Sequence, residues 1–318
     1  MTLAFQQKMS NPTYIIRNYH SEDFDKLVQL RDEVQELGPI ECLISSLDLI
    51  ESVGRQNQSY ENIMLIAERA GEIVGYADVR PELIVGRAVL KWMVHPKHRR
   101  RRLAANLINS AILRTRELGI MTIHANISQD SPMAKALLTK MGFTFIRRFL
   151  ELRMNLSKAL LPEISRIAQL CRPLRPGEEE GLTQLQNRSF TGSWGYNDNT
   201  VEEIIYRISL PNCSPGDVIL AFESDKPIGH CWTRINSWKN EAPGEGTGRI
   251  YMLGVDPTHR GRGLGRQLLL VGLSYLKSKG LHVVELTVDS ENKAACALYK
   301  SLGFKPWTCS LWYEKRLE

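Results

Sequence analysis

The chain has 318 residues, of which 43% are hydrophobic and 24% charged, with a formal net charge of +6. Since this length exceeds a typical domain of roughly 100–200 residues, we expect two domains. The composition excludes a disordered chain, a fibre and an array of short repeats, and the basic charge fits an anionic partner, either nucleic acid or a small phosphorylated ligand.

The sequence predicts no export or membrane segment. The opening stretch MTLAFQQKMSNPTY has no apolar run long enough for a signal peptide, and no stretch approaches the roughly 18 apolar residues of a membrane helix. The six cysteines are widely spaced and form no zinc-type cluster with histidine. We therefore expect a cytoplasmic protein with free thiols and no bound metal.

In chain order, the first half predicts a helix at about 23–36, strands at 63–68, 72–79 and 87–94, a helix at about 101–118, a strand at 121–127 and a helix at 132–142. The second half predicts a helix at 178–190, strands at 218–222, 227–235 and 248–255, a helix at 263–280, a strand at 282–288, a helix at 292–303 and a strand near 307–315. This order implies an α/β protein with two tandem domains, each a mixed, mostly antiparallel central sheet flanked by helices. We place the domains at 1–156 and 171–318, joined by a connector at 157–170.

The two halves share one register. VHPKHRRRRLA (Val94–Ala104) matches VDPTHRGRGLG (Val255–Gly265) at six of eleven positions, at an offset of 161 residues. The same offset carries the pair Gly142-Phe143 onto Gly303-Phe304. Upstream the offset is 154, so the second copy holds seven additional residues, in or near 235–248. A register kept over about fifty residues indicates a tandem duplication.

The stretch Arg260–Gly265 joins a predicted strand to a predicted helix. Its three glycines let the backbone turn tightly, so that successive amide groups point into one concavity beside the positive end of the helix. Such a concavity suits a pyrophosphate. A short glycine-rich run is equally compatible, on its own, with a turn that binds nothing.

Two further motifs extend this pattern. The run N-x-x-A-x-x-L-Y-x-x-x-G-F at 292–304, together with the glycine loop, resembles the acetyl-CoA signature of the GNAT N-acetyltransferase superfamily. The duplication, with Ser-Trp-Gly-Tyr at 193–196, resembles the tandem, mycothiol-synthase-like members of that superfamily. The resemblance covers nearly the whole chain and implies an enzyme that transfers an acyl group from acetyl-CoA to a primary amine of a small metabolite.

The resemblance also implies roles by position. Asn292 would contact the cosubstrate, and Tyr299 would protonate the departing thiolate, a task that suits a phenol near neutral pH. From the sequence alone, Tyr299 is also compatible with a helix residue packed against the sheet. The backbone of one strand segment would hold the pantetheine arm, namely Leu253, Gly254 and Val255. The pyrophosphate would lie on the next segment, formed by Arg260, Gly261, Arg262, Gly263, Leu264, Gly265 and Arg266.

The base that deprotonates the amine is the least defined part of the site. Related tandem enzymes place a glutamate near the start of the strand at 248–255, where this chain has Arg249. We take Glu245, four residues earlier, as the candidate. Glu285, Asp289 and His230 stay open as alternatives, each of which also fits a structural role.

The substrate residues that we predict are Trp194 and Tyr196, in the loop SFTGSWGYNDNT (189–200). A loop rich in glycine, asparagine and aromatic residues suits ligand binding. The same aromatic residues are equally compatible with a turn whose rings fill the core.

The first copy has lost these features. Arg100, Arg102 and Ala104 replace the three glycines, and the counterpart of Tyr299 is Leu138, with Ser131 in the place of Asn292. A side chain at 102 would crowd a pyrophosphate. We therefore expect the N-terminal domain to be degenerate and catalytically silent, a structural or substrate-shaping partner that could bind coenzyme A only through charge.

Two other functions stay open. The enzyme could acetylate a protein or peptide amine, and the run Arg99–Arg102 could bind nucleic acid or a ribosome. Nucleic acid is disfavoured, because the rest of the chain has no comparable basic stripe and the run starts where the duplicated motif predicts a helix. The sequence does not define the oligomeric state.

Overall fold

The computed structural model describes residues 14–36, 63–159, 161, 170–210, 213–236 and 247–318. These residues divide into two compact units. Unit 1 holds the described residues up to Ile146 together with Trp312–Glu318, and unit 2 holds the described residues of Arg147–Leu311.

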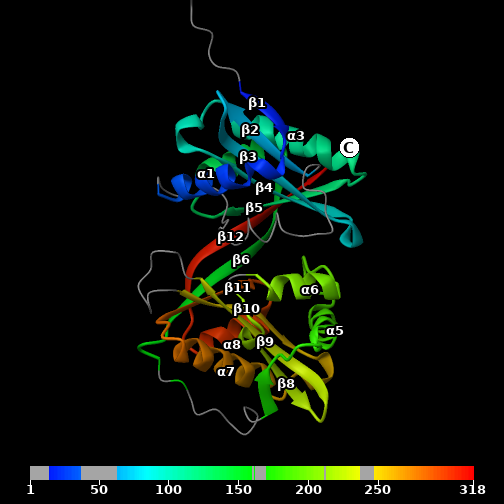
Figure 1. The fold of residues 1–318 in the computed structure, drawn as a ribbon, viewed down its shortest axis with the longest axis vertical. Coiled ribbons are helices and arrows are strands. Elements are labelled where there is room, and N and C mark those ends of the chain that lie inside the picture. Colours follow the sequence, from blue (N-terminus) through cyan, green and yellow to red (C-terminus); the bar gives the residue numbers. More distant parts are fainter. Residues whose placement is uncertain (1–13, 37–62, 160, 162–169, 211–212, 237–246) are drawn as a thin grey trace, which may run out of the picture. The chain divides into compact units, whose positions relative to one another are not determined.

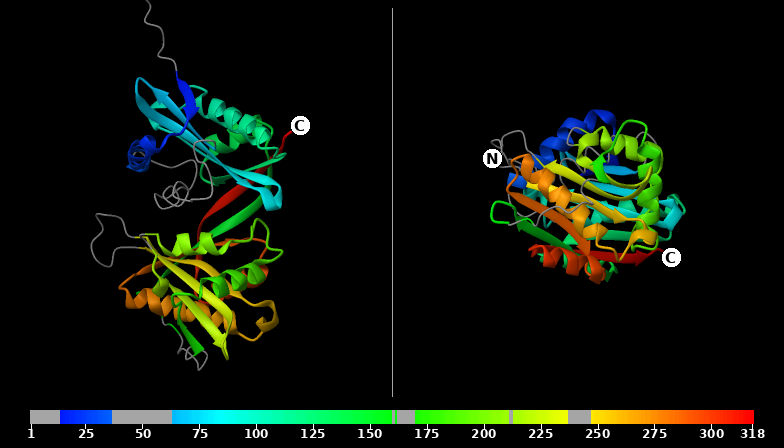
Figure 2. Two further views of the ribbon diagram at one scale, coloured as in Figure 1. Left: turned by 45° about the vertical axis from the view of Figure 1, so that its right-hand side comes forward. Right: turned by 90° about the horizontal axis from the view of Figure 1, so that it is seen from below.

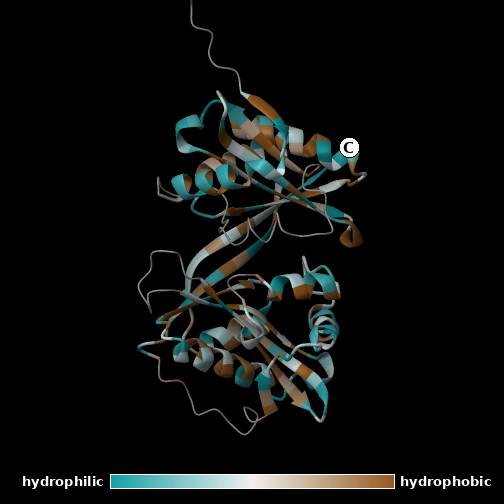
Figure 3. Cartoon of the chain, in the orientation of Figure 1, coloured by the Kyte–Doolittle hydropathy of each residue, from teal (hydrophilic) through white to brown (hydrophobic). Residues whose placement is uncertain are grey.

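Unit 1 is a mixed sheet with helices. Its elements are β1 (Ile15–Asn18), α1 (Phe24–Glu36), β2 (Met64–Arg69), β3 (Glu72–Glu82), β4 (Arg87–Val94), α3 (Leu103–Glu117), β5 (Thr122–Ser128) and α4 (Pro132–Lys140). The strands follow the order β1-β2-β3-β4-β5, with antiparallel pairs except β4–β5, and the end of β12 (Lys305–Arg316) follows β5. Figure 3 shows α1 as mostly hydrophilic and the tip of the β3–β4 hairpin as hydrophobic.

Unit 2 repeats this plan. Its elements are β6 (Thr144–Asn155), β7 (Cys171–Pro173), α5 (Glu179–Phe190), α6 (Val201–Ile208), β8 (Val218–Glu223), β9 (Lys226–Asn236), β10 (Thr247–Val255), α7 (Leu264–Ser278), β11 (Val283–Asp289), α8 (Lys293–Ser301) and the start of β12. The order is β12-β6-β11-β10-β9-β8-β7, and β10–β11 is a parallel pair. The predicted fold class, a mixed and mostly antiparallel sheet flanked by helices in each of two copies, is confirmed.

The sheet of unit 2 has two distinct faces. A Cβ on Gly229 or Gly248 would meet leucines of α7, so these residues face α7. A Cβ on Gly254 would meet His230 and Ser189 of α5, so it points the other way. Helices α5 and α6 therefore cover one face and α7 covers the other, as Figures 1 and 2 show.

Each face has its own apolar core. On the α7 face, Leu268, Leu269, Leu273 and Leu276 are fully buried among residues of α8, β6 and β11. Burial of one such side chain contributes about 1.5–3 kcal/mol. On the α5 face, Trp232 packs with apolar residues of α5, α6 and β8.

Local signals in the sequence define the ends of the long helices. A proline-containing turn precedes α3 and α7, at Pro96–His98 and Pro257–His259. Each helix ends just before a glycine with a left-handed φ, Gly119 at +72° and Gly280 at +79°. Because glycine adopts this conformation without a steric cost, it is the usual residue at such a position.

The last strand of each copy is exchanged between the units. Strand β6 belongs to the first copy in chain order, yet its residues Phe149–Asn155 pair with β11 in unit 2. The end of β12 belongs to the second copy but forms part of unit 1, where His124 Nε2 lies 3.0 Å from Glu314 Oε2. The predicted boundaries at 1–156 and 171–318 describe the repeat along the chain and stay a prediction, and most of the connector, residues 160 and 162–169, lies outside the described residues.

Candidate active site

Strands β10 and β11 separate at the point where the sequence predicts a cosubstrate. Their parallel pairing covers only three residues, from Thr247↔Val283 to Arg249↔Glu285. Beyond Arg249, the described part of β11 forms no ladder with β10. Leu253, Gly254 and Val255 pair with β9 on their other side, so one edge of this segment is left for a ligand.

A β-bulge lies at this point of separation. The pairing of β10 with β9 shifts by one residue between Ile250 and Met252, which makes Tyr251 the additional residue. The matching pair in unit 1, β4 with β3, keeps a regular register throughout. Of the seven additional residues in the second copy, one is therefore Tyr251, and the other six fall in chain order between the end of β9 and the start of β10. Bulges are common beside active sites, because they redirect backbone groups and side chains.

The glycine loop precedes α7 in the predicted position. Gly261 and Gly263 have φ values of +77° and +81°, and Leu264 is the first residue of α7. A Cβ on either glycine would meet no protein atom within 4 Å. These glycines are therefore not required for packing within the protein, and open space lies beside the loop, as a pyrophosphate site requires.

The corresponding loop of unit 1 has the same backbone shape without the glycines. Arg100 and Arg102 adopt left-handed φ values of +61° and +60°. A non-glycine residue in this region costs of order 1–3 kcal/mol. The duplicated loop has therefore kept its conformation at an energetic cost, and side chains now project where unit 2 has open space.

A cavity of about 790 Å³ lies beside this altered loop in unit 1. It extends along the start of α3 and across α4. Its basic lining residues are Arg99, Arg100, Arg102, Arg116, Lys140 and Lys315. Three of the four arginines of the run thus line a concave site beside a helix N-terminus, a geometry that differs from the extended basic surface of a nucleic-acid-binding face.

The polar residues of the unit 2 loop also hold elements together. Arg260 donates through Nε to the carbonyl of Val255 at 3.2 Å and through Nη2 to the carbonyl of Ser189 at 2.6 Å. Arg266 donates to Ser301 of α8 at 2.9 Å. Arg262 is exposed.

Asn292 caps α8 by accepting a hydrogen bond from the Ala295 amide at 3.1 Å. Ser131 caps α4 of unit 1 in the same way, with the Ala134 amide at 3.4 Å from its hydroxyl. The cap contact occupies Oδ1 of Asn292, and the exposed side chain keeps its amide NH₂ for a ligand.

Tyr299 lies on α8 and is 8% exposed, with its ring edge-to-face on Phe304. Among the described residues, its hydroxyl has no hydrogen-bond partner. Burial raises the pKa of Tyr299 well above the ordinary value, so the phenol stays protonated at neutral pH. Its counterpart Leu138 is fully buried in unit 1.

The structure leaves the predicted base outside the described residues, since Glu245 lies in 237–246. Of the alternatives, Glu285 accepts a hydrogen bond from Arg153 Nε at 2.7 Å, and Asp289 lies 3.3 Å from Arg147. His230 is fully enclosed, and burial lowers its pKa to about 3.

A further carboxylate, which the sequence did not indicate, lies on the sheet face opposite α7, the face that also carries Glu285 and Asp289. Glu151 of β6 is opposite Thr287 of β11, whose hydroxyl donates to Glu151 Oε2 at 2.7 Å. Arg249 Nη2 lies 3.7 Å from the same oxygen and donates to the Thr287 hydroxyl. Glu151 was missed because it belongs to the first copy in chain order, and only the strand exchange brings it into unit 2. No local signal in the sequence indicates this pairing.

The two predicted substrate residues have different surroundings. Trp194 is half-buried beside Phe149, at 5.8 Å between ring centroids, and Arg147 lies 5.2 Å over its ring. It therefore lies next to β6 on the face that carries Glu151. Tyr196 donates to Asn187 at 2.8 Å and accepts from Asn199 at 2.8 Å, so its hydroxyl is engaged within the loop. Substrate roles for both residues stay predictions.

Two kinds of feature are absent from the described residues. Of the helices found there, none combines the length and apolar character needed to cross a bilayer. No group of three His, Cys, Asp or Glu side chains in these residues is arranged to hold a metal ion.

Comparison with known proteins agrees with this geometry. The model of the acetyltransferase (GNAT) family matches residues 27–143 and 180–304, one match in each copy. A mycothiol acetyltransferase of Thermobispora bispora is 36% identical over 231 residues, which cover 70% of this chain and 74% of that protein. A mycothiol acetyltransferase of Acidothermus cellulolyticus is 28% identical over 91% of this chain and 90% of its own length.

Solved structures share the fold. A GCN5-related N-acetyltransferase from Sphaerobacter thermophilus has a TM-score of 0.69 at 22% identity and covers 95% of both chains. A tandem GNAT protein from the clavulanic acid biosynthesis pathway has a TM-score of 0.68 at 16% identity, covering 96% of this chain and 98% of its own. Two family matches together span most of the chain, and each includes one of the duplicated loops that precede α3 and α7. The chain therefore belongs to the acetyltransferase (GNAT) family.

Proposed function

We propose that this enzyme transfers the acetyl group of acetyl-CoA to the primary amine of a small metabolite, of the kind that mycothiol acetyltransferases act on, and that unit 2 carries the reaction. The relatives at 28–36% identity support the substrate class. Unit 1 is the non-catalytic partner.

The contrast between the two loops is the observation that carries the assignment to unit 2. Both loops share one left-handed backbone shape, but only the loop of unit 2 has glycines at these positions. A phosphate can approach the amides of Gly261 and Gly263, whereas the equivalent positions of unit 1 carry the side chains of Arg100 and Arg102.

The chain's own residues then have separate tasks. Backbone groups of Leu253–Val255 hold the pantetheine arm as an added strand would, and the Arg260–Arg266 segment holds the pyrophosphate. Acetyl-CoA supplies an activated acyl group, and the amine adds to its carbonyl. Tyr299 donates the proton that the leaving sulfur needs, because burial keeps its phenol protonated.

A panel of amines tests the proposal. Thiol release from acetyl-CoA would be measured with small amino-sugar and amino-thiol metabolites and with peptides that carry free amines. We expect turnover with small metabolites and little with peptides. Preferred turnover of peptides would replace the substrate class, and no release with any amine would contradict the proposed function.

A titration with acetyl-CoA tests the assignment to unit 2. We expect one tight site per chain, lost when the loop of unit 2 is altered. Two sites of similar affinity would contradict a degenerate unit 1.

A further inference from the structure

The α5 face of the unit 2 sheet carries a connected polar group formed by Glu151, Thr287 and Arg249. Thr287 bridges the other two, because its hydroxyl donates to Glu151 and accepts from Arg249. Three adjacent strands, β6, β11 and β10, supply one residue each. We call this group the β6–β11–β10 triad.

The triad lies where β10 and β11 separate. Arg249 is the last residue of β10 that pairs with β11, and Thr287 lies two residues beyond its partner Glu285. The bulge residue Tyr251 follows Arg249 by two positions. The triad therefore borders the point at which a thioester carried between the two strands would present its carbonyl.

Glu151 and Tyr299 belong to opposite faces of the sheet. The neighbours of Glu151 along β6, Leu152 and Leu150, pack into the core of the α7 face with Tyr299, so Glu151 itself faces away from that core. In an acyl transfer, the attacking nitrogen and the departing sulfur occupy different positions around the carbonyl carbon. A proton acceptor and a proton donor on opposite faces can therefore serve both atoms without competing.

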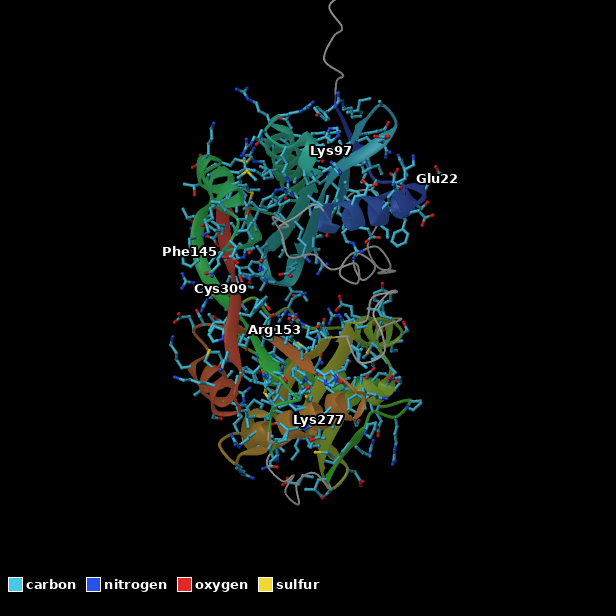
Figure 4. The ribbon with its side chains drawn as sticks, turned by 90° about the vertical axis from the view of Figure 1, so that its left-hand side faces the viewer. Glu22, Lys97, Phe145, Arg153, Lys277 and Cys309 are labelled. Atoms are coloured by element: carbon cyan, nitrogen blue, oxygen red, sulfur yellow. The ribbon has the colours of Figure 1, made fainter. Side chains whose placement is uncertain are left out.

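The other carboxylates of this face are more fully engaged. Two nitrogens of Arg153 contact Glu285, and Trp307 stacks on the same guanidinium at 3.9 Å. Figure 4 shows Arg153 on β6, beside β12. Asp289 contacts Arg147 and also accepts from the Glu291 amide at 3.0 Å. Glu151 differs in that no guanidinium hydrogen-bonds to it: the Thr287 hydroxyl donates to Oε2, Arg249 Nη2 lies 3.7 Å from the same oxygen, and Oε1 has no partner among the described residues.

We propose that Glu151 is the residue that accepts the proton of the substrate ammonium, and that Thr287 and Arg249 position it. This inference rests on the proposed function of unit 2. Strand β10 has no Asp or Glu of its own, and Arg249 lies near its start. The carboxylate is thus supplied from the neighbouring side of the sheet, by a strand of the other copy.

The electrostatics of Glu151 suit this task. Burial raises its pKa, and the neighbouring Glu285 raises it further, while Arg249 and the Thr287 hydroxyl act in the opposite direction. A carboxylate with a raised pKa is a stronger base than an ordinary one. Arg249 and Glu285 are the charged groups within range of Glu151 in the described residues.

The protons balance in this scheme. The substrate ammonium gives one proton to Glu151, which passes it to solvent. The neutral amine forms the C–N bond, and the C–S bond breaks. Tyr299 gives its proton to sulfur and regains one from solvent, the second nitrogen proton passes to solvent, and the third stays in the amide. The products are the N-acetyl compound, coenzyme A and one released proton.

The variant Glu151→Gln tests the proposal, because glutamine keeps the size and the acceptor for Thr287 but cannot take a proton. We expect kcat/KM at pH 7 to fall about 10²–10⁴-fold, the usual contribution of a general base. The acid limb of the pH profile, which reports Glu151 in the wild type, should disappear. Activity should then rise with pH up to the pKa of the amine, because only free amine reacts. Acetyl-CoA affinity should stay within about twofold of the wild-type value, because Glu151 lies outside the two segments proposed to bind acetyl-CoA, Leu253–Val255 and Arg260–Arg266. A Glu151→Gln enzyme with wild-type kcat/KM and an unchanged acid limb would overturn the inference.

Two further variants test whether the effect is specific to Glu151 and depends on the charge beside it. Glu180→Gln removes an exposed carboxylate on α5 and should leave the whole profile unchanged. Arg249→Met removes a charge that lowers the pKa of Glu151, so the acid limb should move to higher pH. An acid limb that stays in place in a folded Arg249→Met enzyme would also overturn the inference. If the wild type itself acetylates no amine, the proposed function fails first, and this outcome is distinct from an active wild type with an indifferent Glu151.

Discussion

At the scale of single residues, unit 2 presents a buried phenol on one face of a sheet and a partly buried carboxylate on the other. The contacts that fix these two side chains leave free the phenol hydroxyl and one carboxylate oxygen, the atoms that would exchange protons with the substrates. The Tyr299 ring packs on Phe304 while its hydroxyl has no partner in the described residues, and Glu151 is fixed through Oε2 alone. Both residues lose solvent on burial, which raises both pKa values and favours the neutral acid and the stronger base.

Replacing Tyr299 by phenylalanine removes the proton donor and keeps the ring contact. We expect kcat to fall about 10²–10⁴-fold, with acetyl-CoA affinity and the melting temperature little changed. Because burial raises the Tyr299 pKa above the ordinary tyrosine value, the wild-type basic limb should lie above pH 10. Thiol release across a pH series, with calorimetric titration of acetyl-CoA, measures both effects.

Tyr275→Phe is the matched control. This tyrosine of α7 also has a raised pKa, but its hydroxyl donates to Asp217 at 2.8 Å. Its loss should lower the free energy of unfolding by about 1 kcal/mol and leave kcat unchanged. An active Tyr299→Phe enzyme would reject the phenol as the acid.

The roles of single residues could be predicted from the sequence where those residues belong to a recognisable motif. Tyr299 and Asn292 share a motif with Gly303-Phe304, and the structure places both on or beside α8. The carboxylate Glu151 has no such signal, because its relevance depends on pairing with a strand more than 130 residues away. Glu245, the base favoured from the sequence, lies in a stretch outside the described residues.

At the scale of elements, the strand–loop–helix segments before α3 and α7 show that a loop can keep its shape after its glycines are lost. Arg100 and Arg102 hold left-handed φ values close to those of Gly261 and Gly263. The backbone conformation is therefore a property of the fold around the loop, and the glycines of unit 2 are needed for what approaches it.

Gly263→Arg transfers the substitution of unit 1 into unit 2. We expect the variant to fold, because Arg102 already adopts this conformation and no protein atom lies within 4 Å of the added Cβ. Its free energy of unfolding should fall by about 1–3 kcal/mol. Acetyl-CoA binding, measured by titration, should be abolished, because the side chain covers the amides.

Gly280→Arg is the control at the other end of α7. Gly280 also has a left-handed φ, +79°, and open space around its Cβ. The two variants should lose similar stability, and only Gly263→Arg should lose the cosubstrate. Normal binding by Gly263→Arg would show that the side chain at this position does not block the site, and unit 1 could then not be called degenerate on that ground.

Most elements could be predicted from periodicity and turn residues, and β4, β10, α3 and α7 lie within a few residues of their predicted bounds. Strands β1, β6 and β7 were missed. For β6, side chains of TFIRRFLELRMN alternate only toward its end, where Leu150, Leu152 and Met154 enter the core. Its partner is decided by long-range packing, which a local pattern does not contain.

At the scale of the whole molecule, the repeat along the chain and the compact units do not coincide. Unit 2 needs Arg147–Asn155 from the first copy, and unit 1 needs Trp312–Glu318 from the second. Cutting the chain at the end of the first copy therefore removes a strand from the sheet that holds the proposed site.

Two fragments test this point. Residues 171–318 lack Leu152 and Met154 of the core and leave β11 with an unpaired edge, so we expect poor solubility and no acetyl-CoA binding. Residues 147–318 restore the strand and should bind acetyl-CoA with nearly full affinity. Equal folding and binding by both fragments, judged by circular dichroism and titration, would show that β6 is dispensable.

The exchange of strands also determines when the sheet of unit 1 can be completed during translation. Unit 1 includes Trp312–Glu318, which follow all of unit 2 in chain order, so its sheet stays incomplete until the second copy has been made. At roughly 5–20 residues per second, translation of the second copy takes on the order of 10–30 s. During that interval β5 presents an open edge to other nascent chains. We therefore expect the first half to depend on chaperones during translation.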